Sequence, residues 1–168
     1  MITEAATYLA GALERIGPAD LDARTPCTEW TVRDLLAHLG DATAVLLEAA
    51  DGAVDAEPRF GGPVLARTRL LAAAGVPLGP VRIGDRELDG ELLDAAGALE
   101  LAVHGWDLNT ALGRTDPIPE NLARRLLSAA LPVDRPEFAP ATTPPPAATA
   151  AQRLLSSLGR TSHAELAS

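Results

Sequence analysis

The chain has 168 residues, of which 47% are hydrophobic, and its formal net charge is −9. This length predicts one domain with a sizeable core, and the acidic balance argues against binding to nucleic acid or to anionic membrane surfaces. A single cysteine, Cys27, excludes an internal disulfide and a cysteine-rich zinc site. Alanine and leucine are abundant whereas aromatic residues make up only 3%, so we expect an all-α fold with a core of Leu, Ala and Val.

The spacing of apolar residues predicts a four-helix bundle with short extra helices. The expected helices span about residues 4–16, 32–50, 64–74, 91–112, 120–131 and 148–158. Thr3 is the expected N-cap of the first helix, while Thr31 and Asp34 fit a capping box at the start of the second.

Two stretches interrupt the helical pattern. Residues 76–90 carry Gly84-Asp85 between short β-capable runs, which predicts a small β-hairpin. Residues 132–147 contain six prolines and predict an extended strap instead of a helix. We expect a single domain over residues 1–160, followed by a loose C-terminal tail over residues 161–168.

The stretch ELAVHGWDL, residues 100–108, places three ionisable side chains on a predicted helix that is otherwise almost entirely apolar. At about 100° per residue, Glu100, His104 and Asp107 share a wedge of roughly 60°. A helix that is apolar nearly all round is usually buried, and an unpaired charge is too unfavourable to keep in a protein interior. The charge of Glu100 therefore requires a partner inside the molecule.

A metal ion is one such partner, because helical bundles often build metal sites from Glu and His residues one turn apart. Glu100 and His104 form such a pair, and His38 is the remaining histidine outside the C-terminal tail. Asp107 is expected to accept a hydrogen bond from His104 and not to bind the metal. Two alternatives stay open at this point: a buried hydrogen-bonded pair of Glu100 and His104, and a hydrogen-bonded core role for His38.

Three motifs, taken in order along nearly the whole chain, carry a family resemblance. They are TPCTEWTVRDLLAHL (residues 25–39), ELAVHGWDL (residues 100–108) and LLSSLGR (residues 154–160). The chain resembles the DinB-like superfamily, and in particular the branch related to the N-terminal domain of mycothiol-dependent maleylpyruvate isomerase. The resemblance implies a bundle that holds a divalent metal through His38, Glu100 and His104. The second domain of the isomerase has no counterpart in this sequence, so the substrate and reaction are not carried over.

The resemblance favours a metal-dependent enzyme. Three protein ligands leave coordination positions open, which is typical of catalytic zinc sites. We expect Zn(II), with nickel, iron and manganese as alternatives, to activate a thiol such as mycothiol or to polarise a small electrophilic substrate. The expected activity is that of a thiol S-transferase, an isomerase or a cyclase, with a biosynthetic pathway as one setting. The other hypotheses are a non-catalytic, metal-stabilised bundle and an iron site built from two histidines and one carboxylate.

Other expectations concern the surroundings of this site. The sequence shows no signal peptide and no apolar run of transmembrane length, which predicts a cytoplasmic protein. The expected partner is a small-molecule substrate or thiol, and the expected oligomeric state is a monomer or homodimer. Cys27 is expected to have a packing role, because His38 lies about 10 Å further along the following helix. The irregular loops of residues 52–63 and 76–90 are expected to border the open side of the metal. They carry Arg59, Arg82 and Arg86, one of which is a candidate to bind a carboxylate of the substrate or thiol; a solvated surface position is the alternative for each.

Overall fold

The computed structural model describes residues 1–27, 29–54, 62–75, 79–129 and 139–160. These residues form six α-helices and a small three-stranded sheet, which confirms the predicted all-α fold with a small β element. The helices are α1 (Ile2–Leu13), α2 (Val32–Ala50), α3 (Val64–Ala74), α4 (Gly90–Ala111), α5 (Glu120–Ser128) and α6 (Ala150–Ser157). Within the described residues, none of the helices combines the length and the apolar character needed to cross a membrane.

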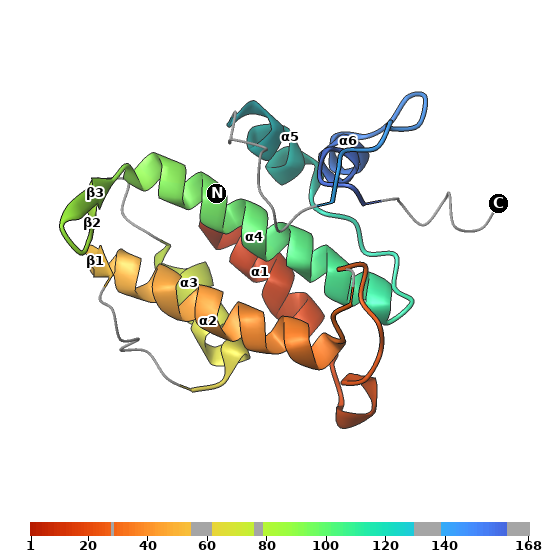
Figure 1. Cartoon of the computed structure of the whole chain (residues 1–168), viewed down its shortest axis with the longest axis horizontal. Coiled ribbons are helices and arrows are strands. Elements are labelled where there is room, and N and C mark those ends of the chain that lie inside the picture. Colours follow the sequence, from red (N-terminus) through yellow and green to blue (C-terminus); the bar gives the residue numbers. More distant parts are fainter. Residues whose placement is uncertain (28, 55–61, 76–78, 130–138, 161–168) are drawn as a thin grey trace.

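Helices α1 to α4 close into a bundle. α1 packs against α3 and α4, and α2 packs against the same two helices. α4 runs the length of the molecule with α1 and α2 along one side and α5 towards the other, while α6 packs against α5 (Figure 1). The predicted C-terminal tail, the last two residues of the predicted fifth helix and residues 132–138 of the proline-rich strap lie outside the described residues. The described part of the strap, residues 139–147, contains no helix or strand.

The sheet joins one end of α2 to the start of α4. β2 (Val81–Ile83) and β3 (Arg86–Leu88) pair in antiparallel fashion around a turn in which Gly84 has a φ of +60°, so the predicted hairpin is confirmed. β1 (Ala53–Val54) adds a parallel strand beside β2. This strand was not predicted, because two residues are too few to show an alternating pattern.

Two helices begin with the reciprocal hydrogen bonds of a capping box. At the start of α2, Asp34 N donates to Thr31 Oγ1 at 3.3 Å and Thr31 N donates to Asp34 Oδ2 at 2.9 Å. Thr149 and Gln152 repeat the arrangement at the start of α6. The capping box predicted for α2 is confirmed, and it fixes the first turn of the helix that carries His38.

The N-cap predicted for α1 was wrong. Thr3 lies inside the helix, which begins at Ile2. The side chain of Asp94 on α4 accepts hydrogen bonds from the nitrogens of Met1 and Ile2, at 2.7 and 3.0 Å. A carboxylate from a neighbouring helix therefore satisfies the first N–H groups, and local sequence rules do not reveal such a partner.

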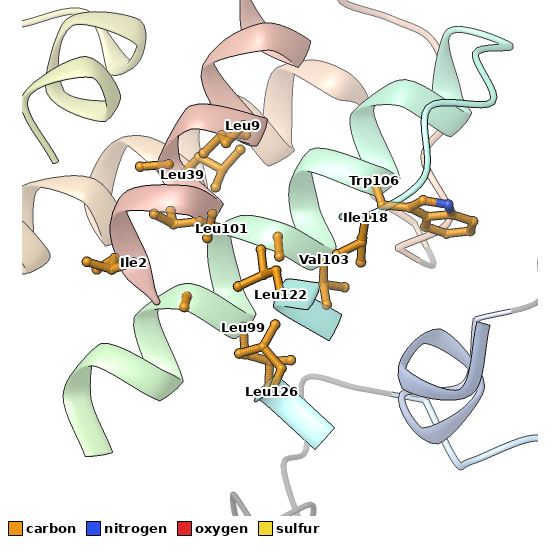
Figure 2. Close-up of a cluster of buried hydrophobic side chains, with 14 of the residues drawn as sticks. Ile2, Leu9, Leu39, Leu99, Leu101, Val103, Trp106, Ile118, Leu122 and Leu126 are labelled. Carbon is orange, nitrogen blue, oxygen red and sulfur yellow. The ribbon is translucent and has the colours of Figure 1, made fainter. Parts of the chain in front are cut away.

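α4 is apolar over most of its circumference, and it lies between two groups of core side chains. Figure 2 shows one group between α4, α1 and α2, and a second group between α4 and α5. The first contains Leu101, Leu9 and Leu39, and the second contains Leu99, Val103, Leu122 and Leu126. The polar wedge of α4 is buried together with this apolar surface, as the sequence pattern predicted.

Gly97 allows α4 to approach α1 and α2 closely. A Cβ atom at this position would lie 2.6 Å from a methyl carbon of Leu46 and 2.9 Å from one of Ile2, both of which are buried. We expect Gly97→Ala to lower the free energy of unfolding by about 1–3 kcal/mol through overpacking. A Cβ atom at Gly11 on α1 would meet no other atom within 4 Å, so Gly11→Ala is the control and should raise stability by up to about 1 kcal/mol. Urea denaturation measures both, and equal effects would contradict this account.

Candidate metal centre

The packing of α2 against α4 brings together residues that are 62 positions apart in the sequence. Oε1 of Glu100 contacts Nε2 of His38 and lies 3.2 Å from Nε2 of His104. One nitrogen or oxygen atom from each of the three residues lies within 4.8 Å of the other two. The structure therefore places all three predicted ligands around a single point.

Asp107 lies on the other side of the His104 ring. Its Oδ2 atom is 2.9 Å from Nδ1 of His104, and its side chain has no exposed surface. His104 therefore directs Nε2 toward Glu100 and Nδ1 toward Asp107, so both nitrogens are oriented. The contact that the sequence predicted between these two residues is present, and metal-binding histidines commonly have an acceptor of this kind.

The indole of Trp30 forms an aromatic wall beside the two histidines. Its ring centroid is 5.0 Å from that of His38 and 6.4 Å from that of His104, and it stacks on the latter with an interplanar angle of 27°. Trp30 directly precedes the Thr31 cap, so the capping box of α2 also positions this ring. An aromatic ring at this place excludes water from one side of the imidazoles.

The position of Cys27 contradicts the prediction that it lies away from the site. Its Sγ atom donates to Oδ2 of Asp107 at 3.1 Å and is 3.6 Å from Nδ1 of His104. The loop folds back on itself, since Thr25 N donates to the carbonyl oxygen of Trp30 at 3.0 Å. The prediction measured distance along the axis of α2, whereas this loop turns Cys27 toward α4.

Arg160 is a site residue that the sequence analysis did not identify. Its side chain is buried, and Nη2 donates to Oδ2 of Asp107 at 2.9 Å and to Sγ of Cys27 at 3.3 Å. Cys27, His104 and Asp107 are close enough to form a second set of metal ligands. The guanidinium group already neutralises this set, and its charge disfavours a cation there. The sequence signal that could have identified Arg160 is its position at the end of the LLSSLGR motif.

Hydrogen bonds control the charges in this cluster. Burial favours neutral His104, but its hydrogen bonds to Asp107, Cys27 and Glu100 outweigh that effect and raise its pKa to about 11. Burial also opposes ionisation of Glu100, yet hydrogen bonds from His104 and His38 lower the pKa of its carboxyl group. Asp107 behaves similarly: burial is outweighed by hydrogen bonds from His104 and Arg160, which lower its pKa. Charged His104 therefore lies between two carboxylates.

One edge of the cluster reaches the surface. The side chain of His38 is 37% exposed, compared with 16% for Glu100 and 7% for His104. The prediction that Arg82 and Arg86 border this edge was wrong. Both lie in the sheet beyond Ala50, and at 1.5 Å per residue that end of α2 is about 18 Å from His38. Arg59 lies outside the described residues.

Comparison with known proteins supports the resemblance deduced from the motifs. Residues 2–74 match the model of the mycothiol maleylpyruvate isomerase N-terminal domain. The predicted family resemblance is confirmed. The part matching the mycothiol maleylpyruvate isomerase N-terminal domain covers α1 to α3 and includes His38, whereas Glu100 and His104 follow on α4.

Two relatives extend the similarity beyond the matched domain. They are uncharacterized proteins from two strains of Mycobacterium tuberculosis, each 26% identical to the chain over 136 residues. The alignments cover 77% of this chain and 75% of each relative. No solved structure matches the chain significantly. The domain match and the helical fold both agree with the resemblance to the DinB-like type that the motifs predicted.

Proposed function

We propose that His38, Glu100 and His104 bind one divalent metal ion, with zinc as the preferred metal. Two imidazole nitrogens and one carboxylate oxygen are a donor set that suits zinc. The donors converge from α2 and α4 within 4.8 Å, and ionised Glu100 supplies negative charge for a cation. Asp107 supports this assignment, because its contact with Nδ1 of His104 leaves Nε2 as the ligand atom.

We further propose that the protein is a metal-dependent enzyme of the thiol S-transferase or isomerase type that uses mycothiol or a related thiol. The observation that carries this proposal is a three-residue donor set whose His38 edge is partly exposed. Such a site leaves room for one exogenous ligand, whereas a structural zinc site is closed by four protein ligands. Zinc supplies the acidity that makes a thiol nucleophilic at neutral pH, or it polarises a carbonyl group.

The residues of the chain have separate tasks in this proposal. Glu100 lowers the net charge of the site, which is required because the centre is mostly buried. Asp107 fixes the ring of His104, and Trp30 shields the two imidazoles from water. His38 lies at the exposed edge, so a thiol or electrophilic substrate approaches along its side of the cluster.

A cobalt-substituted sample tests the proposed thiol chemistry. Addition of mycothiol is expected to produce a sulfur-to-cobalt charge-transfer band in the near ultraviolet, and His38→Ala should not show it. Arg67→Met is the matched control, because Arg67 joins α3 to α2 through Thr43 and Gly40 and contacts none of the three ligands. A cobalt spectrum that is indifferent to thiols would reject the transferase proposal and leave a metal that only stabilises the bundle.

A further inference from the structure

We infer that Arg160 is a positioning residue for the proposed metal site: it holds Asp107 so that His104 presents Nε2 to the metal. This inference rests on the proposed function. Arg160 is 53 positions from Asp107 in the sequence and belongs to the segment that follows α6. A C-terminal residue would thus control a metal centre whose ligands all come from α2 and α4.

The end of α6 directs Arg160 toward the site. Arg160 N donates to the carbonyl oxygen of Leu155 at 2.9 Å, and Gly159 N donates to that of Ser156 at 3.1 Å. This pair of bonds is a Schellman motif, in which the chain turns sharply after a residue in the left-handed region. Gly159 supplies that conformation with a φ of +72°, and a Cβ there would lie 2.7 Å from the carbonyl oxygen of Ala139.

Arg160 donates hydrogen bonds to both oxygens of the Asp107 carboxylate. Nη2 donates to Oδ2 at 2.9 Å and Nε donates to Oδ1 at 3.3 Å, which is the two-point contact that only a guanidinium group provides. Nη1 donates to the carbonyl oxygen of Leu158 at 3.0 Å, so the side chain is tied to its own helix end. The carboxylate is therefore fixed in orientation as well as in charge.

This two-point contact determines how the Asp107 carboxylate is oriented toward the imidazole of His104. The same Oδ2 atom that receives Nη2 of Arg160 also contacts Nδ1 of His104 at 2.9 Å and accepts from Cys27 at 3.1 Å. The Asp107 side chain is completely buried. If Arg160 were absent, the carboxylate would lose its fixed orientation and its buried counter-charge, so the orientation of His104 would loosen.

The test compares zinc affinity, measured by competition with a chelator, in Arg160→Met, Arg160→Lys and wild-type protein. Arg160→Met is expected to weaken binding by about 10-fold or more, since loss of an outer partner typically weakens metal affinity by about 10- to 100-fold. Arg160→Lys should lie between the two, because lysine keeps the charge but cannot bind both oxygens. Arg67→Met again is the control for a lost structural arginine. It should reduce the stability of the metal-free protein while leaving zinc affinity unchanged.

A double-mutant cycle with Asp107→Asn shows whether Arg160 acts through Asp107. In the Asp107→Asn background, Arg160→Met should have little further effect on affinity. Full additivity of the two changes, or equal zinc affinity in Arg160→Met and wild type, would overturn the inference while leaving the metal site intact. Wild-type protein that binds no more zinc than His104→Ala would overturn the metal site as well. If Arg160→Met fails to fold, Arg160→Lys decides, and unchanged affinity in that variant overturns the two-point contact.

Discussion

The purified His104→Ala variant is expected to contain far less than one zinc ion per chain, whereas the wild type is expected to contain about one. His104 has the most buried side chain of the three, and the remaining His38 and Glu100 would form only a two-residue site. The loss should exceed the 10- to 100-fold that removal of a supporting partner typically causes. Elemental analysis after dialysis, together with zinc titration in the presence of a competing chelator, measures the effect.

His163→Ala is the matched control, because it removes the other histidine that is not assigned to the site. It should bind zinc as the wild type does. Circular dichroism of both metal-free variants separates loss of a ligand from loss of the fold. Equal zinc content in His104→Ala and wild-type protein would reject the assignment of the three ligands, since His38 and Glu100 alone supply only two donors.

The sequence predicted that the ionisable residues of α4 share one face because the information it needed is local. Glu100, His104 and Asp107 lie on one helix, and the helical period alone places them on one face. His38 could be added because the chain has so few histidines, and the packing of α2 on α4 brings it to Glu100. The capping box at Thr31 is equally local, and it too was predicted correctly.

The features that the sequence did not reveal depend on tertiary contacts. Cys27 reaches Asp107 through a folded loop, and Arg160 reaches it from a different helix end. Neither contact can be predicted from the helical period or from the number of residues that separate the partners in the sequence. The cap of α1 shows the same limit, because its acceptor, Asp94, lies on α4. Periodicity identifies which residues share a face, but it does not identify the residues from other segments that complete a buried network.

This network of hydrogen bonds and ion pairs allows the buried charges to balance without a bound metal ion. Asp107 and Glu100 carry negative charge, while Arg160 and protonated His104 carry positive charge, so the charges of these four groups balance one another. The two hypotheses left open by the sequence, a metal ligand set and a hydrogen-bonded pair, thus describe one geometry with different occupants of Nε2. The choice between them is a competition between a proton and a cation.

That competition gives the second large prediction: zinc affinity should fall about 10-fold for each pH unit lowered from pH 9 to pH 7. The raised pKa of His104, about 11, means that the metal-free protein carries a proton on this ring throughout the range. Glu100 is already ionised, since its pKa is lowered, and releases none. Binding must therefore release one proton from His104, and lower pH favours the protonated, metal-free state.

Calorimetry in two buffers of different ionisation enthalpy measures the proton released, with about one expected per zinc ion at pH 8. A histidine with an ordinary pKa of about 6.5 would release almost none at that pH, and affinity would not change between pH 8 and pH 9. Asp107→Asn provides the matched comparison, because it removes the first of the hydrogen bonds that raise the pKa of His104. This variant should release fewer protons and show a flatter pH profile. The proton to be released is the one on Nε2 of His104, which faces Glu100 in the metal-free protein, whereas Nδ1 faces Asp107. A flat profile in the wild type would mean that His104 does not exchange this proton for the metal.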